Sequence, residues 1–130
     1  DDDDSAGDDD DSAAGLCADR IGGAVLTLQA YNDVISFWTT DSAFIDEAIA
    51  RIGTNNLIVL LSTPIEGSDC DTAWSWHPDP SYGQFTNSAP FNPACIGSPS
   101  EVEADLSGYQ AASAGWCPLD VGVISVSDQR

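Results

Sequence analysis

The chain has 130 residues, and 42% of them are hydrophobic, which is enough for the core of one domain. Its formal net charge is -19, because 22 acidic residues stand against three arginines and no lysine. Such a charge repels nucleic acid and anionic lipid, and it attracts cations and basic partners. No apolar run reaches the roughly 18 residues of a membrane-spanning helix, so we expect no membrane span.

Residues 1–15 form an acidic arm in which a tetra-aspartate followed by Ser-Ala occurs twice. Such a block of like charge cannot fold alone, and its simplest interpretation is a solvated, disordered tail. The alternative is a cation site, and Ca2+ is the natural candidate because it takes about 6–8 oxygen ligands. The abrupt start, without a signal peptide, is what we expect of a processed, mature N-terminus. The candidate ligands are Asp1, Asp2, Asp3, Asp4, Asp8, Asp9, Asp10 and Asp11.

Strand and helix patterns alternate through the first half of residues 16–130. The residue types predict strands at 24–28 and 31–39. A helix at about 42–52 follows, with Asp41 as its N-cap and Gly53 as its C′ stop, because apolar side chains recur on one helical face. The apolar run at 57–62 predicts a central strand, and 64–68 reads as a loop.

Two tryptophans mark the next element. Trp74 and Trp76 alternate within 72–80, which predicts a short strand whose indoles face the core, ended by two prolines. A further strand starts at 84–86. The capping box that begins at Ser98 predicts a helix over about 99–107 that stops at Gly108. With a last strand at 121–126, the expected fold is α+β: a small antiparallel sheet with two helices in one domain over 16–130.

The four cysteines form no C-x-x-C pair, which argues against a zinc or redox site. An even number in a small acidic chain indicates two disulfides and an oxidising compartment. Of the three possible pairings we favour Cys17–Cys70 with Cys95–Cys117, because the second closes a short loop around one helix.

Three motifs occur in a fixed order: Trp-Ser-Trp-His-Pro-Asp-Pro at 74–80, Cys-Ile-Gly-Ser-Pro-Ser-Glu-Val-Glu at 95–103, and Trp-Cys-Pro at 116–118. Together they resemble a family of small secreted domains named after the N-terminal part of a calmodulin-binding protein. The resemblance covers about 30–127 and implies an extracellular α+β domain with the Cys95–Cys117 bridge. It brings no activity, and the chain departs from it in lacking acidic residues around Cys95.

The single histidine, His77, is the one candidate for a general base of its type, paired with Asp79 or Asp71. A lone histidine in such a strand is more often a structural hydrogen-bonding residue. The sequence contains no nucleophile motif and no nucleotide-binding glycine loop, so we expect no enzyme. No segment matches an EF-hand, so any calcium site is irregular. Further candidate calcium ligands are Asp69, Asp71, Asp79, Glu101 and Glu103.

The leading hypothesis is a secreted, calcium-binding structural subunit that self-assembles into a filament through the acidic arm. Its partners are then divalent cations and further copies of the chain, arranged head-to-tail. The arm could also donate the strand at 24–28 to a neighbour. The alternative is a monomeric carbohydrate- or surface-binding module, with the aromatic side chains as a platform for sugars. Core packing is the simpler role for these aromatics, which are Trp74, Trp76, Tyr82 and Phe85.

Overall fold

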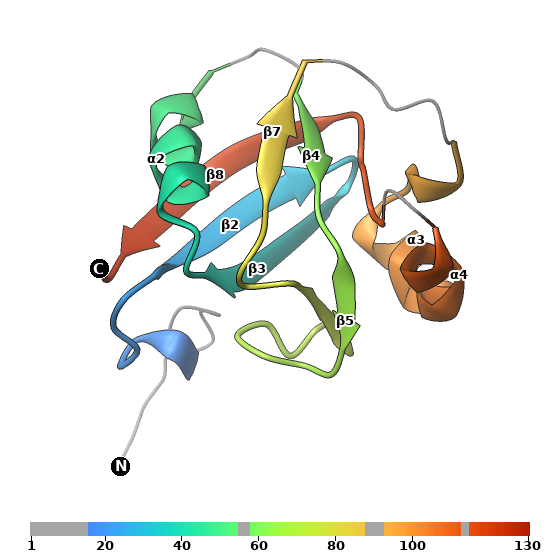
Figure 1. The fold of residues 1–130 in the computed structure, drawn as a ribbon, viewed down its shortest axis with the longest axis horizontal. Coiled ribbons are helices and arrows are strands. Elements are labelled where there is room, and N and C mark those ends of the chain that lie inside the picture. The colour runs from blue at the N-terminus through green and yellow to red at the C-terminus, as the bar shows by residue number, and fades with distance from the viewer. Residues whose placement is uncertain (1–15, 55–57, 88–92, 113–114) are drawn as a thin grey trace.

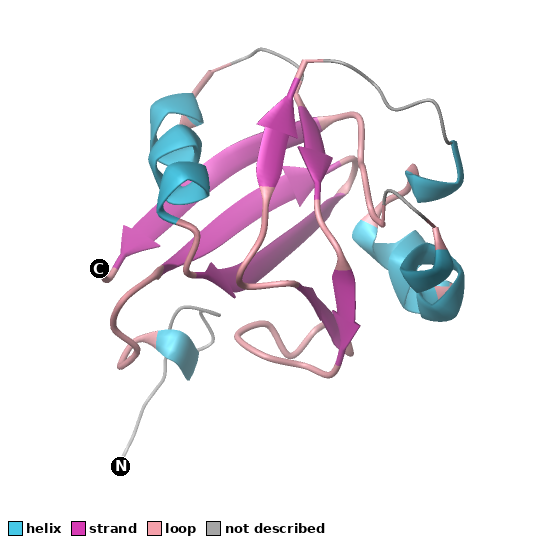
Figure 2. Cartoon of the chain, in the orientation of Figure 1, coloured by secondary structure: helices cyan, strands magenta, loops and turns pink. Residues whose placement is uncertain are grey.

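The computed structural model describes residues 16–54, 58–87, 93–112 and 115–130, and it has the expected α+β architecture (Figures 1 and 2). The strands are β2 (Ala24–Ala30), β3 (Asp33–Thr39), β4 (Val59–Leu61), β5 (Pro64–Glu66), β6 (Trp76–Pro78), β7 (Gln84–Thr86) and β8 (Val121–Asp128). The helices are α2 (Ser42–Arg51), α3 (Pro99–Ala104) and α4 (Leu106–Ala111), with a 3-10 turn η2 (Pro93–Cys95). No helix within these ranges is both long and apolar enough to cross a membrane.

The largest sheet has three antiparallel strands in the order β3-β2-β8. Successive side chains of a strand point to opposite faces. One face therefore presents Leu26, opposite Phe37, to the main core, where it meets α2, β4 and β7 (Figure 1). The other face presents Val25 and its partner Trp38, which pack against both cysteines of the first disulfide.

The strand at 24–28, which we considered as a donor to a neighbouring copy, is part of β2 and lies in the middle of this sheet. β2 pairs with β3 along one side and with β8 along the other. Its core-facing side chains, including Leu26 and Leu28, are fully buried. Donation of residues 24–28 would break both ladders of the same molecule, so the structure argues against that role.

The predicted helix at about 42–52 is confirmed as α2, together with its predicted N-cap and C′ residues. The Asp41 carboxylate accepts the N–H of Phe44 at 3.2 Å, which is the bond of an N-cap. Gly53 has a φ of +76°, as a C′ glycine needs. Ile45 and Ala48 are fully buried, so the apolar stripe faces the core.

The second predicted helix starts as expected, but its predicted end is wrong. Ser98 and Glu101 form both bonds of the capping box. The chain then breaks at Asp105, whose φ of -146° is not helical, and α4 continues through Gly108 to Ala111. A Cβ on Gly108 would lie 2.4 Å from the Asp105 carboxylate, so this glycine allows a close approach instead of stopping the helix. Continuation through α4 brings Tyr109 into the core.

Residues 64–66 form a strand where the sequence predicted a loop. β5 pairs with β6, so that Pro64 lies opposite Pro78 at the end of a two-stranded ladder. The strand at the tryptophans is shorter than expected, because Trp74 precedes it and only Trp76 lies within it. Both predicted disulfides, Cys17–Cys70 and Cys95–Cys117, are present.

Candidate functional site

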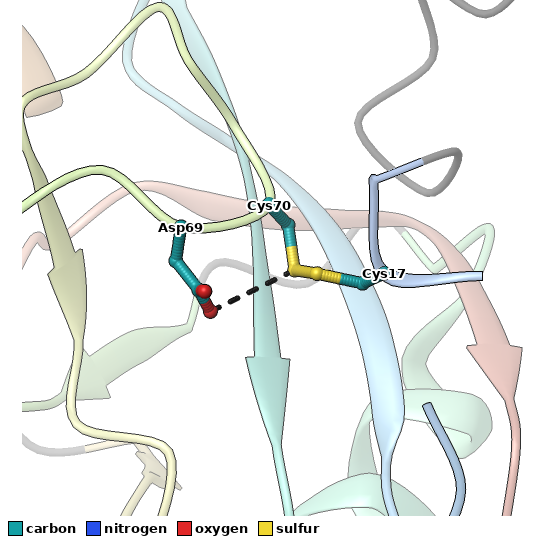
Figure 3. Close-up of side chains that lie close together, drawn as sticks. All are labelled: Cys17, Asp69 and Cys70. Carbon is teal, nitrogen blue, oxygen red and sulfur yellow. Dashed lines mark hydrogen bonds between the residues drawn. A yellow bond between two sulfur atoms is a disulfide. The ribbon is translucent and has the colours of Figure 1, made fainter. Parts of the chain in front are cut away.

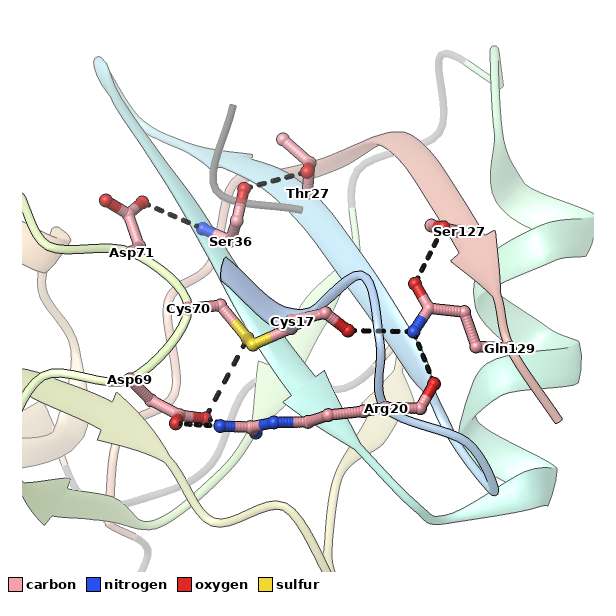
Figure 4. Close-up of a disulfide and its surroundings, with 9 residues drawn as sticks. All are labelled: Cys17, Arg20, Thr27, Ser36, Asp69, Cys70, Asp71, Ser127 and Gln129. Atoms are coloured by element: carbon pink, nitrogen blue, oxygen red, sulfur yellow. Dashed lines mark hydrogen bonds and ion pairs between the residues drawn. A yellow bond between two sulfur atoms is a disulfide. The ribbon is translucent and has the colours of Figure 1, made fainter. Parts of the chain in front are cut away.

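The acidic arm joins the described fold at a covalent anchor. Cys17, two residues after the arm, forms a disulfide with Cys70 at a Cα–Cα distance of 5.6 Å, and both cysteines are buried (Figure 3). The side-chain amide of Gln129 donates to the carbonyl oxygens of Cys17, at 2.9 Å, and Arg20, at 2.7 Å (Figure 4). The chain that follows the arm is thus held to the sheet from two directions.

An ion pair lies beside this disulfide. The Arg20 guanidinium donates two hydrogen bonds to the Asp69 carboxylate, at 3.0 and 2.7 Å (Figure 4). The same guanidinium lies 5.6 Å from the centroid of the Trp38 ring. The hydrogen bonds from Arg20 hold the pKa of Asp69 below its usual value, and they raise the pKa of Arg20.

Cys17, Asp69 and Cys70 are close enough in space to suggest a metal site (Figure 3). Their chemistry does not fit one in this oxidised state, because both sulfur atoms are bonded to each other and thiolates are needed as ligands. The Asp69 oxygens also face the guanidinium of Arg20, which repels a cation. We therefore assign the trio a structural role.

Two more of the predicted calcium ligands hold the loop between β5 and β6. The Asp71 carboxylate accepts the N–H of Ser36 at 3.1 Å and the N–H of Ala73 at 3.0 Å. Glu103, on α3, accepts the N–H of Ser75 at 2.9 Å and also its hydroxyl. Hydrogen bonds from Ser75 lower the pKa of Glu103.

The remaining two stabilise local turns. Asp79 accepts the N–H and the hydroxyl of Ser81, at 2.9 and 2.8 Å. Glu101 accepts the N–H of Ser98 at 2.9 Å within the capping box. Apart from the cysteine trio, no three His, Cys, Asp or Glu ligand atoms of the described ranges lie within 4.8 Å of one another. No three of these five carboxylates therefore converge on one point, and the eight arm aspartates lie outside the described residues.

His77 makes the hydrogen bond expected of a structural histidine. Its Nδ1 lies 2.7 Å from the carbonyl oxygen of Gly67, which favours the tautomer with the proton on Nδ1. The bond spans the loop between β5 and β6 and therefore closes its base.

The aromatic side chains do not form the platform that the alternative hypothesis needs. Trp76 and Phe85 are buried, at 1% and 5% exposure, while Tyr82 is 43% exposed. Trp76 packs edge-to-face on Trp116 with ring centroids 5.1 Å apart. Core packing is confirmed for Trp76 and Phe85. A sugar-binding surface shared by all four aromatic residues is contradicted, because these two are not accessible.

No family model, no curated protein and no solved structure matches the chain. The resemblance to the family of small secreted domains therefore stays a prediction. The architecture and the pairing of cysteines are known from the fold itself.

Sequence reasoning missed the residues that hold the anchor. Arg20 and Gln129 belong to no motif, and only folding brings Arg20 to Asp69 and Gln129 to the Cys17 carbonyl. One signal was available, since Arg20 is one of only three arginines in a chain with 22 acidic residues. A scarce cation in such a chain is expected to bind a carboxylate.

Proposed function

We propose that the protein is a secreted structural subunit whose acidic arm binds Ca2+ and links neighbouring copies into an extracellular polymer. The observation that carries the proposal is the junction of eight aspartates to a buried, crosslinked cysteine. Because the anchor is fixed, the acidic segment is attached at the same point of the fold in every copy. Bound cations can then bridge arms and surfaces of different copies.

The charges of the fold support a need for external cations. Each of the three arginines is already bound to carboxylates of its own chain: Arg20 to Asp69, Arg51 to Glu47, and Arg130 to both Asp46 and Asp128. The formal net charge nevertheless remains -19. Copies of the chain repel one another unless salt or divalent ions reduce this charge.

The disulfides support secretion, because such bonds form and persist mainly in oxidising compartments. The bond at His77 supports a structural rather than a catalytic role for that residue. A non-enzymatic subunit that acts through its surface charge is consistent with these features.

Analytical ultracentrifugation tests the proposal. In 0.15 M salt, a physiological ionic strength, we expect Ca2+ to increase the sedimentation coefficient of the oxidised protein and EDTA to reverse the change. Changing four arm aspartates to asparagine should weaken the effect of calcium. The arm variant carries Asn at Asp8, Asp9, Asp10 and Asp11, and the matched control neutralises four exposed acids of the fold: Asp19, Glu66, Asp105 and Asp120.

The control variant distinguishes a specific effect of the arm from a general effect of the total negative charge. The proposal requires the control variant to assemble with calcium as the wild type does. Equal loss of assembly in both variants would show that total charge matters rather than the arm. A size unchanged by Ca2+ and EDTA, in low and high salt, would overturn the proposal.

A further inference from the structure

Strand β3 lies at one end of the three-stranded sheet, and its sequence is well suited to pairing. Residues 34–39 read Val-Ile-Ser-Phe-Trp-Thr, with no charge, no proline and no glycine. The order β3-β2-β8 leaves one side of β3 without a neighbouring described strand. Such an uncharged, β-branched and aromatic edge is a template for pairing with another chain unless something covers it.

The covering element is the loop between β5 and β6, residues 67–75, which we call the edge loop. Its Trp74 Nε1 donates to the carbonyl oxygen of Val34 at 3.2 Å. Its Asp71 carboxylate accepts the N–H of Ser36 at 3.1 Å (Figure 4). Residues two apart on a strand present their N–H and C=O groups to the same side. Two side chains of the edge loop thus make bonds that a fourth strand would make.

Several contacts hold the edge loop in this position. Its base is closed by the N–H of Gly67, which donates to the Ser75 carbonyl at 2.8 Å. The Ser68 hydroxyl donates to the Trp74 carbonyl at 2.6 Å. Outside the loop, Glu103 of α3 binds Ser75, and the disulfide fixes Cys70. The cover is therefore attached to the sheet, to α3 and to the arm anchor.

We propose that the edge loop takes the place of a fourth strand, and that β3, once uncovered, pairs with β3 of a second copy. A second copy is the fitting occupant because an uncharged segment can pair with itself in antiparallel orientation, as a two-fold symmetric interface requires. Val34 is 47% exposed even with the loop in place, so part of the apolar edge already faces solvent. The high net charge opposes close approach of two copies, so pairing needs salt.

The double variant Asp71→Ala with Trp74→Phe tests this proposal, because it removes both side-chain bonds from the edge loop to β3 and keeps the disulfide. The Pro80 carbonyl still accepts from the Thr39 hydroxyl at the end of the strand. All measurements are made in EDTA with high salt, where calcium-linked assembly through the arm is absent. Failure here and failure of the proposed function are then distinguishable. The matched control is Asp79→Ala, which removes side-chain bonds of the same kind to Ser81 but none to β3.

Hydrogen exchange of the Ser36 amide reports on covering, and light scattering after size exclusion reports on pairing. We expect the Ser36 amide to exchange roughly tenfold faster in the double variant. We also expect a mass of twice the monomer, while the wild type and the control remain monomeric. Adding Val34→Glu to the double variant should restore the monomer, because like charges on paired edge strands repel.

Two results would overturn the proposal. Unchanged exchange at Ser36 would show that the edge loop does not protect β3. Faster exchange with a monomer at every salt concentration would show that the uncovered edge does not pair. Should the double variant fail to fold by circular dichroism, Trp74→Phe alone is measured, and a smaller rise in Ser36 exchange with partial dimerisation is then required.

Discussion

Removal of the Cys17–Cys70 disulfide is expected to lower the free energy of unfolding by about 4 kcal/mol. The two cysteines are 53 residues apart, and the entropy of closing a loop of that length in the unfolded chain corresponds to about 4 kcal/mol at 25 °C. The bridge Cys95–Cys117 closes a loop of only 22 residues, for which the same relation predicts about 3.4 kcal/mol. The bridge at the arm anchor is therefore expected to stabilise the fold more.

Urea unfolding followed by tryptophan fluorescence measures both effects. The two variants are Cys17→Ala with Cys70→Ala, and Cys95→Ala with Cys117→Ala. All four cysteines are buried, so the loss of packed sulfur atoms destabilises both variants in the same direction. In a protein of 130 residues, about 4 kcal/mol corresponds to a decrease of about 15 °C in the melting temperature.

The test is which of the two variants has the lower free energy of unfolding. If removal of the Cys95–Cys117 bridge destabilises the protein more, loop length does not control the contribution of these disulfides. If removal of Cys17–Cys70 changes the free energy of unfolding by less than about 1 kcal/mol, the anchor is held by its noncovalent contacts, and the chain-entropy argument fails.

Three further predictions concern single positions. Asp69→Asn should lower stability at pH 7 by about 1 kcal/mol, since the ion pair with Arg20 is partly exposed. The pKa of Asp69 is lowered in the folded protein, so its carboxylate stabilises the fold above the unfolded pKa near 4 and loses this effect as pH falls further. Below about pH 4, the free energy of unfolding should therefore vary less with pH in the variant than in the wild type. The buried Trp76 Nε1 has no hydrogen-bond partner among the described residues. Replacing the indole by the isosteric benzothiophene should therefore leave stability unchanged or raise it by about 1 kcal/mol, and a loss in urea unfolding would reveal a partner. Gly115→Ala should lower the free energy of unfolding by at least about 2 kcal/mol, because φ is +69° and the new Cβ would lie 2.4 Å from the Ser62 carbonyl oxygen. The control is Gly122→Ala, whose Cβ would meet open space, and its free energy of unfolding should be within about 0.5 kcal/mol of the wild-type value.

Local signals in the sequence predicted the parts of the fold that depend on near neighbours. The caps of α2 and α3 use bonds between residues three positions apart, such as Asp41 with Phe44. The strands β2, β3 and β8 follow from β-branched and aromatic runs. The favoured cysteine pairing was also correct, because a short crosslinked loop around a helix limits the alternatives.

The candidate site was predicted less well, because contacts between distant residues decide it. Asp69 and Asp71 look like free ligands in the sequence. In the fold, Asp69 binds Arg20 across 49 residues, and Asp71 binds the Ser36 amide across 35. Glu103 reaches Ser75 across 28 residues. No local pattern distinguishes a carboxylate that will meet a donor from one that will face solvent.

The sequence alone determined the high negative charge, the α+β class, the capping of the helices and the presence of an even set of cysteines. These properties depend on composition and on residues within a few positions of each other. Only the tertiary structure decided which carboxylates are used inside the fold, that β5 pairs with β6, and that the edge loop covers β3. Those outcomes require chain segments far apart in sequence to be brought together, and the burial of one common core determines where they meet.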